Sequence, residues 1–256
     1  MWGAVLAGAA VAVAVLGGWA LTIALALVAA LVAREWASIT IDKSAAATAA
    51  IALPAAAAVI AAEVSGLVAA LAIIAVGALA AAGWLRSAWP AIGVAYAGLL
   101  GVALVLIRDD PGVGLEAMVF VLAVVWATDT SAYFAGRALG GPKLWPAVSP
   151  NKTWSGAIGG ALAALAAGSG VVLVADLDTG FLAITLLALL ISVAAQFGDL
   201  YESAIKRRFG TKDAGSLIPG HGGVMDRVDG LTFASVSALL VGALRPGDVG
   251  AGLLLW

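Results

Sequence analysis

Long uncharged stretches alternate with short polar segments along the whole chain. A charged side chain at the centre of a bilayer costs at least about 2.5 kcal/mol, so uncharged stretches of this length indicate transmembrane helices. The stretches run over Trp2–Ala33, Ser44–Ala62, Val64–Leu85, Ser87–Ile107, Ala117–Thr128, Thr153–Ala175, Thr179–Gly198 and Gly230–Leu244. The pattern predicts an all-α, polytopic integral membrane protein.

The first stretch is too long for one span. A single helix over Trp2–Ala33 would be about 48 Å long, against about 30 Å of hydrocarbon in a bilayer. Gly17 and Gly18 lie at its middle, and glycine favours a break in a helix. We therefore expect a tight helical hairpin of Gly3–Leu16 and Trp19–Ala33, with one strongly tilted helix as the alternative.

The stretch that begins at Ala117 continues past Asp129 to about Ala138, so this span contains an ionisable residue. The whole pattern then gives about nine transmembrane helices. We expect two regions: an N-terminal membrane region over residues 1–110 with about five spans, and a C-terminal region over residues 111–256 with the polar connections 137–154 and 199–229.

Composition supports a membrane protein and excludes several kinds of site. Hydrophobic residues make up 63% of the chain and charged residues 11%, with a mean hydropathy of +1.10, whereas a soluble domain has roughly a quarter charged residues. The absence of cysteine excludes disulfides, iron–sulfur clusters and thiolate zinc sites, and the single histidine excludes a multi-histidine metal site. The net charge of −2 excludes nucleic acid as a bulk electrostatic partner.

The basic residues are distributed asymmetrically between the connections. When the connections are numbered in order, every Lys and Arg except Arg108 and Arg245 lies in an even-numbered one. The positive-inside rule predicts that the even connections face the cytoplasm. We expect a multi-pass protein of the cell membrane, the inner or plasma membrane, with its polar site on the cytoplasmic side.

Charge is concentrated in two segments, and the later one begins on the helix that leaves the eighth predicted span. Asp199, Glu202 and Lys206 fall on one face of this helix. Ser203 and Arg207 share the adjacent face. Two carboxylates and an ammonium group in one stripe can bind a divalent cation and a phosphate together. A solvated helix end with intrahelical ion pairs is an equally good interpretation.

The next segment, Phe209–Asp229, is rich in glycine and contains Pro219, which excludes a regular helix. Its free backbone N–H groups can wrap anionic oxygens closely. Asp226 and Asp229 follow one helical turn apart, and hard oxygen ligands without histidine or thiolate partners favour Mg²⁺ over zinc. The lone His221 can either bind phosphate or satisfy a local turn.

The earlier polar segment combines a helix face with a loop. Asp129, Tyr133 and Arg137 repeat every four residues, so an acid, a phenol and a guanidinium line one wall of a helix. Ser149–Thr153, with the sequence SPNKT, supplies two hydroxyls, an amide and a lysine where the next span begins, and helix N-termini favour anions. The segment lacks the residue order of a Walker A loop. A simple N-cap with a surface lysine is the alternative.

The segment Ser203–Asp229, SAIKRRFGTKDAGSLIPGHGGVMDRVD, resembles the signature of the phosphatidate cytidylyltransferase (CDP-diacylglycerol synthase) family. The matching positions are Ser203, Ile205, Lys206, Arg207, Lys212, Asp213, Gly215, Ile218, Pro219, His221, Gly222, Gly223, Asp226, Arg227 and Asp229. The resemblance extends to GDLYES at Gly198–Ser203 and to SPNKTW at Ser149–Trp154. A spacing this long with so many polar fixed points is far more specific than a lone glycine motif.

This resemblance implies transfer of the cytidylyl group of CTP to phosphatidic acid, which gives CDP-diacylglycerol and pyrophosphate at the cytoplasmic face. It also implies Mg²⁺ held by Asp199 and Asp226, and a second, monovalent cation such as K⁺. The expected partners are CTP, phosphatidic acid and membrane lipids, without nucleic acid. A homodimer is a candidate assembly.

The resemblance and the residue types together give candidate roles. The expected catalytic residues are Asp199, Asp226, Lys206, Arg207, Lys212, Asp213, Arg227 and Asp229. The cations among them, with Lys152, would hold phosphate oxygens, while Asp213 and Asp229 would orient these cations or complete the metal shell. Asp129 would ligate the cation or order the lipid phosphate. The expected substrate-binding residues are Ser149, Asn151, Lys152, Thr153, Ser203, His221, Gly222, Gly223, Asp129, Tyr133 and Arg137.

Three other classes compete with this interpretation. A transporter or channel could use Asp129 in an ion path, but it would place ionisable residues in several spans, and the earlier spans contain none. A CDP-alcohol phosphotransferase needs an Ala-Arg pair after its Asp-Gly pair, and none follows Asp229-Gly230. A CTP-dependent polyprenol or phytol kinase lacks the full spacing from Lys212-Asp213 to Asp229.

Overall fold

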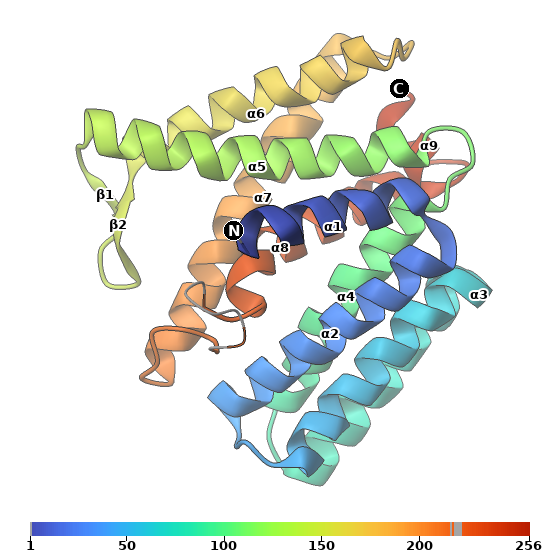
Figure 1. Ribbon diagram of the computed structural model, residues 1–256, viewed down its shortest axis with the longest axis vertical. Coiled ribbons are helices and arrows are strands. Elements are labelled where there is room, and N and C mark those ends of the chain that lie inside the picture. Colours follow the sequence, from blue (N-terminus) through green and yellow to red (C-terminus); the bar gives the residue numbers. More distant parts are fainter. Residues whose placement is uncertain (1, 216, 218–221) are drawn as a thin grey trace. The chain divides into compact units, whose positions relative to one another are not determined.

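The computed structural model describes residues 2–215, 217 and 222–256 of the chain (Figure 1). The helices are α1 (Trp2–Leu16), α2 (Gly18–Thr40), α3 (Ala45–Leu85), α4 (Trp89–Arg108), α5 (Gly114–Leu139), α6 (Trp154–Val174), α7 (Phe181–Arg208), α8 (Met225–Ala243) and α9 (Val249–Leu254). Two short strands, β1 (Lys143–Trp145) and β2 (Ser149–Thr153), form an antiparallel hairpin. The expected all-α fold is confirmed, with one small hairpin that the hydrophobic pattern did not indicate.

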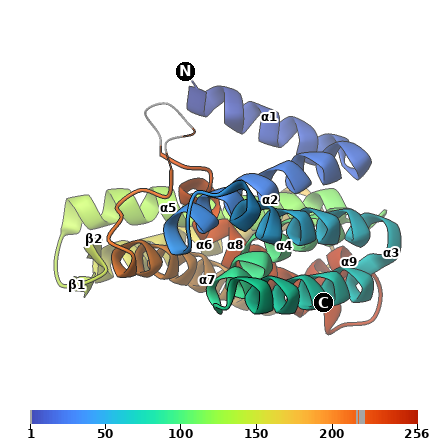
Figure 2. The same cartoon turned by 90° about the horizontal axis from the view of Figure 1, so that it is seen from below.

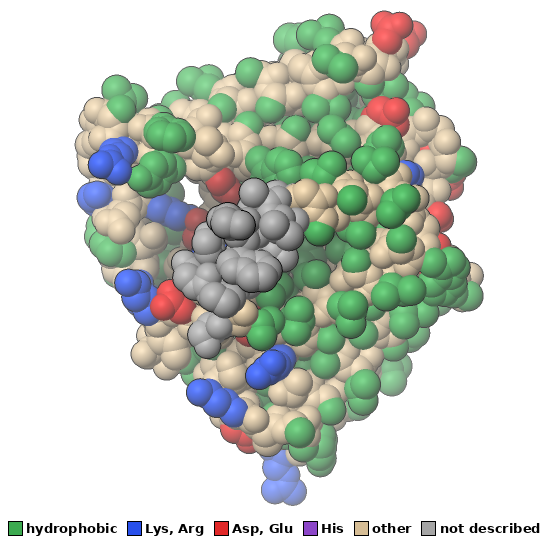
Figure 3. All heavy atoms as spheres, in the orientation of Figure 1, with side chains coloured by type: hydrophobic (Ala, Val, Ile, Leu, Met, Phe, Trp, Pro, Cys, Tyr) green, Lys and Arg blue, Asp and Glu red, His purple; other side chains and the backbone are tan. Residues whose placement is uncertain are grey.

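Six helices, α2 to α7, are long and apolar enough to cross a bilayer, counted over the described residues. Large apolar side chains lie on their outer faces. Leu53, Val68 and Leu79 on α3 are each at least 70% exposed, and Figure 3 shows hydrophobic side chains across the visible face of α2 and α3. Exposure of this much apolar surface to water is unfavourable, whereas contact with lipid tails is not. The chain is therefore a multi-pass membrane protein.

Two glycines mark the break between α1 and α2, Gly17 between the helices and Gly18 as the first residue of α2. Gly17 has a φ of 64° and Gly18 a φ of 49°, and glycine adopts these left-handed values at little cost. The expected pair of helices is thus confirmed, and the single tilted helix is wrong. Arg108, at the end of α4, donates from Nε to the carbonyl oxygen of Ala14 at 2.8 Å and from Nη2 to that of Val15 at 3.0 Å. These bonds satisfy carbonyl groups that the last turn of α1 leaves open.

The two helices expected on either side of Glu63 form one element, α3, that breaks at Gly66 instead. Gly66 has a φ of 77° and a ψ of −170° inside α3, a conformation suited to glycine. The carboxylate of Glu63 accepts a hydrogen bond of 2.7 Å from the hydroxyl of Thr22 in α2, so Glu63 is satisfied without leaving the helix. Beyond the break, Gly77 lies against Pro54 of the first half. The predicted position of the break was therefore wrong.

The chain divides into two compact units. The first unit comprises Met1–Asp109 and Asp213–Val228, and the second comprises Asp110–Lys212 and Asp229–Trp256. The glycine-rich segment thus groups with the N-terminal helices, and α8 begins in the first unit and continues in the second.

In the first unit, α2, α3 and α4 lie against one another (Figure 2). Trp36 of α2 is fully buried in this packing, donates from Nε1 to the carbonyl oxygen of Trp89 at 2.9 Å, and stacks on the ring of Tyr96 at 5.2 Å. Gly93 makes room for the indole, since a Cβ there would come within 2.5 Å of it. The packing fixes the end of α2 that carries Glu35.

In the second unit, α5 and α6 pack side by side through glycines of α6 (Figure 1). A Cβ on Gly156 would lie 2.7 Å from the carbonyl oxygen of Ala132, and one on Gly160 would lie 2.8 Å from that of Thr128. Small residues allow this close backbone approach between membrane helices. The hydroxyl of Thr128 also donates to that of Ser192 in α7 at 2.9 Å. These contacts hold α5 and α7, which carry polar residues of this unit, together with α6.

Candidate active site

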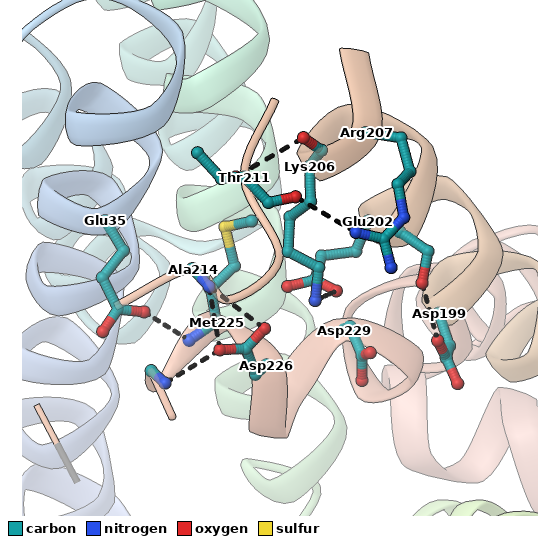
Figure 4. A network of polar contacts seen from close by, with 12 residues as sticks. Glu35, Asp199, Glu202, Lys206, Arg207, Thr211, Ala214, Met225, Asp226 and Asp229 are labelled. Carbon is teal, nitrogen blue, oxygen red and sulfur yellow. Dashed lines mark hydrogen bonds and ion pairs between the residues drawn. The ribbon is translucent and has the colours of Figure 1, made fainter. Parts of the chain in front are cut away.

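The carboxylate of Asp226 organises the glycine-rich segment of the first unit. Asp226 lies in the first turn of α8, and its Oδ2 accepts the backbone N–H of Ala214 at 3.0 Å and that of Gly223 at 2.8 Å (Figure 4). Gly222 has a φ of 81°, and a Cβ there would lie 2.9 Å from the same oxygen. We expected the N–H groups of this segment to wrap anionic oxygens, and two of them wrap a carboxylate of the chain itself.

A second carboxylate reaches the same segment from α2. Glu35 accepts the N–H of Val224 on Oε1 at 3.0 Å and the N–H of Met225 on Oε2 at 2.7 Å, and Figure 4 shows it pointing toward Met225. These N–H groups stand at the start of α8, where a helix leaves its amides without partners. Glu35 was missed in the sequence because a lone acidic residue beside Arg34, at the end of a predicted span, belongs to no motif.

In the second unit, Asp199 of α7 forms an ion pair with Lys152 of β2. The same carboxylate accepts a longer hydrogen bond of 3.4 Å from the hydroxyl of Ser203, one turn further along α7. The structure therefore brings together three predicted site residues from two segments that lie far apart in the sequence.

Asp229 lies within the electrostatic influence of Asp199 and Lys152. Gly198 of α7 lies against Asp229 and Gly230 of α8, since a Cβ on it would come within 2.5 Å of the carbonyl oxygen of Asp229. Asp229 precedes the apolar part of α8 and lies outside the six candidate spans. Burial, and after it the negative charge of Asp199, raise the pKa of Asp229 to about 7, against a lowering hydrogen bond from the N–H of Gly230. The charge of Asp129 raises it further. A bound cation would relieve this repulsion.

Glu202 and Lys206 form an ion pair with each other along α7, at 2.7 Å. Glu202 is almost fully buried, with 1% of its surface exposed. The intrahelical ion pair, which was the alternative interpretation of this face, therefore describes these two residues. Arg207 donates from Nη1 to the carbonyl oxygen of Thr211 at 3.3 Å and so closes the end of α7 (Figure 4).

The other predicted residues of the glycine-rich segment differ in accessibility. Lys212, Asp213 and Arg227 have exposed side chains, so they can be reached by a substrate phosphate. Gly223 is buried, and its N–H is already bound by Asp226. His221 lies outside the described residues, and its role stays a prediction.

On α5, the structure joins two of the three predicted residues. The guanidinium of Arg137 donates from Nη1 to the hydroxyl of Tyr133 at 2.9 Å, and Asp129 lies two turns before Arg137 on the same helix. All three side chains are exposed. The phenol and the guanidinium thus act as one paired group at the end of α5.

The SPNKT sequence forms strand β2 and not the first turn of a helix. Ser149, Asn151 and Lys152 lie on this strand. Thr153 ends it, and its Oγ1 accepts the N–H of Gly156 at 3.1 Å, which makes Thr153 the N-cap of α6. The capping role named as the alternative is therefore correct for Thr153, while Lys152 is engaged with Asp199.

The two predicted Mg²⁺ ligands belong to different units, Asp199 to the second and Asp226 to the first. Within the part of the chain that the structure describes, no group of three or more acidic, histidine or cysteine residues is arranged to hold a metal. Mg²⁺ usually keeps water and substrate phosphate among its ligands, so a site with one or two carboxylates needs no such group. The pair stays a prediction.

Known proteins resemble more than half of this chain. Phosphatidate cytidylyltransferase of Brucella abortus is 57% identical over 158 residues, which are 61% of this chain and 57% of the relative. The proteins of the same name from Bacillus subtilis and Staphylococcus haemolyticus are 43% identical over 138 residues and 39% identical over 150 residues. These matches cover 54% and 59% of this chain, and 51% and 56% of the relatives. The chain spans little more than half the length of these curated relatives.

The broader comparison covers most of the chain. A sequence model of the cytidylyltransferase family matches residues 1–244, which include the carboxylates and cations of the candidate site. The chain therefore belongs to the cytidylyltransferase family.

Proposed function

We propose that the protein transfers the cytidylyl group of CTP to phosphatidic acid, forming CDP-diacylglycerol and releasing pyrophosphate. The family assignment over residues 1–244 carries this proposal. The matched relatives are named phosphatidate cytidylyltransferase, and the segment Ser203–Asp229 has the polar spacing expected of such an enzyme.

The reaction needs little covalent help from the protein. The phosphate of phosphatidic acid is anionic near neutral pH, so one of its oxygens can attack the α-phosphorus of CTP without an activated serine or cysteine. The new P–O bond forms as the bond to pyrophosphate breaks. Because two polyanions must meet, their repulsion is the main obstacle, and the protein acts by positioning and by charge neutralisation.

The carboxylates present fit a divalent cation such as Mg²⁺. Burial, and after it the negative charges of Asp199 and Asp129, raise the pKa of Asp229, and a nearby cation would favour its charged form. Asp226 accepts the backbone N–H groups of Ala214 and Gly223. We assign the metal to Asp199 and Asp226, where it would supply positive charge to the phosphates of CTP. A second cation such as K⁺ belongs to the same proposal.

The basic residues would hold the remaining phosphate oxygens. Lys152 already places an ammonium group at Asp199, and Lys212 and Arg227 are exposed. We assign these three to direct contacts with CTP or with the lipid phosphate. Lys206 is paired with buried Glu202. Its positive charge would therefore act on the phosphates through space and not through a direct contact.

The proposal includes a topology with about nine spans. The short helix α1, the two halves of α3 on either side of Gly66, and the apolar part of α8 after Asp229 would account for the spans beyond the candidate helices. The even connections would face the cytoplasm, where CTP is found, while the acyl chains stay among the helices. The cell membrane is the proposed location, and a homodimer is the proposed assembly to test.

The test uses the purified protein in mixed micelles with phosphatidic acid and CTP labelled with ³²P on either the α- or the γ-phosphate. We expect Mg²⁺-dependent transfer of the α-label to a lipid that migrates as CDP-diacylglycerol, with the γ-label recovered as pyrophosphate. A parallel reaction contains phytol or polyprenol in place of phosphatidic acid. Transfer of the γ-label to that lipid would instead establish a kinase. No label in any lipid would overturn the proposal and favour the transporter.

Two variants test the metal assignment in the same assay. Asp226→Ala and the isosteric Asp226→Asn are both expected to abolish Mg²⁺-dependent product, because neither leaves a charged ligand. Asp42→Asn, a change at an exposed residue between α2 and α3, is the control and should keep wild-type turnover. Near-normal turnover of Asp226→Asn, with the protein folded by size-exclusion chromatography, would contradict the assignment.

A further inference from the structure

Glu35 is a buried carboxylate that the proposed mechanism does not use. It is 6% exposed, and its two oxygens bind the consecutive N–H groups of Val224 and Met225 at 3.0 Å and 2.7 Å. The partners lie 189 and 190 residues away in the sequence, so this is a tertiary contact and not a local cap. A negative charge at a helix N-terminus is stabilised by the converging N–H groups. Glu35 therefore fixes the place where α8 begins.

Two glycines of the segment are fitted to this carboxylate. A Cβ on Gly223 would lie 2.5 Å from Oε2 of Glu35, and a Cβ on Gly215 would lie 2.7 Å from Oε1. Neither glycine has a left-handed φ, so the backbone conformation does not demand them. The close approach of Glu35 explains why neither position has room for a side chain.

The contact leads directly to Asp226. Glu35 binds the N–H of Met225, and the next residue, Asp226, binds the N–H groups of Ala214 and Gly223 through its own carboxylate. Figure 4 shows Glu35, Met225, Ala214 and Asp226 joined in this sequence of contacts. A shift in the start of α8 would therefore move Asp226 and the segment around it together.

We propose that Glu35 is a positioning residue for the reaction: it acts through the start of α8 to hold Asp226 in the place where the site binds Mg²⁺ and CTP. The effect on turnover rests on the proposed function, whereas the structural anchor does not. The inference gives the N-terminal half of the chain a part in the site.

The kinetic test compares Glu35→Gln with Glu63→Gln in the cytidylyl transfer assay. Glu63 is the matched control, because it is an acidic residue of the same unit whose carboxylate accepts the hydroxyl of Thr22. Removal of a charge-assisted hydrogen bond is expected to raise the Mg²⁺ and CTP concentrations for half-maximal rate by about tenfold or more in Glu35→Gln. Glu63→Gln should leave both concentrations near those of the wild type. A role in folding alone would lower the amount of active protein at unchanged half-saturation, and that result would overturn the proposal.

Hydrogen exchange tests the anchor without any assay of activity. In the wild-type protein the amides of Val224 and Met225 should exchange slowly, and in Glu35→Gln and Glu35→Ala they should exchange at least about tenfold faster. Glu63→Gln should leave them protected. Unchanged protection in both Glu35 variants would overturn the inference. If the wild type makes no product, the proposed function fails, and the exchange rates still decide whether Glu35 holds α8.

A double-mutant cycle tests the fit of the glycine to the carboxylate. Gly215→Ala in the wild-type background should lower activity and speed exchange at Val224, because the new Cβ would collide with Glu35. In the Glu35→Ala background the same change should have little further effect, since the obstacle is gone. Additive effects of the two substitutions would contradict the inferred fit.

Discussion

Lys152 forms an ion pair with the carboxylate of Asp199. The proposed mechanism assigns the same carboxylate to Mg²⁺. An ammonium group on a flexible stem can leave one oxygen ligand for another without a change in the backbone. Lys152 can therefore hold Asp199 in place before substrate binds and turn to a phosphate oxygen afterwards. Such an exchange would need only a rotation of the Lys152 side chain, because β2 and α7 fix the backbones of the two residues.

We predict that Lys152→Ala lowers kcat/KM for CTP by about tenfold or more, because a charge-assisted contact to phosphate is lost. Lys143→Ala, which removes an exposed lysine from the other strand of the same hairpin, should have a small effect. The measurement is the initial rate of CDP-diacylglycerol formation at varied CTP. Equal losses in the two variants would show that only the net charge of the hairpin matters.

Residues such as Asp199, Lys152 and Asp229 could be selected from the sequence because charge is rare in so apolar a chain, and rare charges at span ends mark polar contacts. The ion pair between Glu202 and Lys206 was foreseen only as an alternative, since helical spacing alone does not say which neighbour a carboxylate takes. Glu35 could not be selected, because its partners are backbone N–H groups nearly two hundred residues away.

Among the elements, the helices were predictable and their breaks were less so. Absence of charge located α4, α6 and α7 to within a few residues at most ends. The break in α3 was placed at Glu63 because a charge was expected to leave the membrane, whereas the hydroxyl of Thr22 satisfies it inside the helix. The β1–β2 hairpin lacks the alternating pattern of a longer strand pair and gave no periodic signal.

The packing of α5 on α6 depends on glycine, and we predict that Gly160→Ala destabilises the protein by about 1 to 3 kcal/mol. The added Cβ would lie 2.8 Å from the carbonyl oxygen of Thr128, so the helices must move apart. Gly170→Ala, on the same helix, is the control, because beyond the neighbouring backbone of α6 a Cβ there would meet nothing within 4 Å. Thermal unfolding in detergent should show a lower midpoint for Gly160→Ala alone. Similar midpoints for the two variants would mean that the interface tolerates a methyl group.

On the scale of the whole molecule, the glycine-rich segment groups with the N-terminal helices and not with the second unit that precedes and follows it in sequence. The motifs that carry the family resemblance lie in the C-terminal half of the chain. The sequence therefore predicts only membrane spans for the N-terminal half. Contacts from α2 to the start of α8 could not be predicted, because hydrophobic pattern and local spacing carry no information on which distant segments meet.

The absence of cysteine makes the proposed orientation directly testable. We predict that Asp178→Cys, between α6 and α7, reacts with a membrane-impermeant maleimide in intact cells, while Lys143→Cys, in β1, reacts only after permeabilisation. The reason is that the basic connections are retained in the cytoplasm. Both positions are exposed in the structure, so accessibility from water does not differ between them. The reverse pattern of labelling would contradict the cytoplasmic placement of the site.

Arg108 is one of two basic residues that depart from the charge asymmetry, and its hydrogen bonds to Ala14 and Val15 account for the departure. A guanidinium that binds the last carbonyl groups of a helix has a structural role, so its position does not indicate which side of the membrane is cytoplasmic. These two hydrogen bonds also have a consequence for the order in which the helices assemble during synthesis. The carbonyl groups at the end of α1 can gain this partner only after the ribosome has synthesised α4. Although α1 precedes α4 in the sequence, its end is thus expected to reach its final hydrogen bonding only after α4 has been inserted.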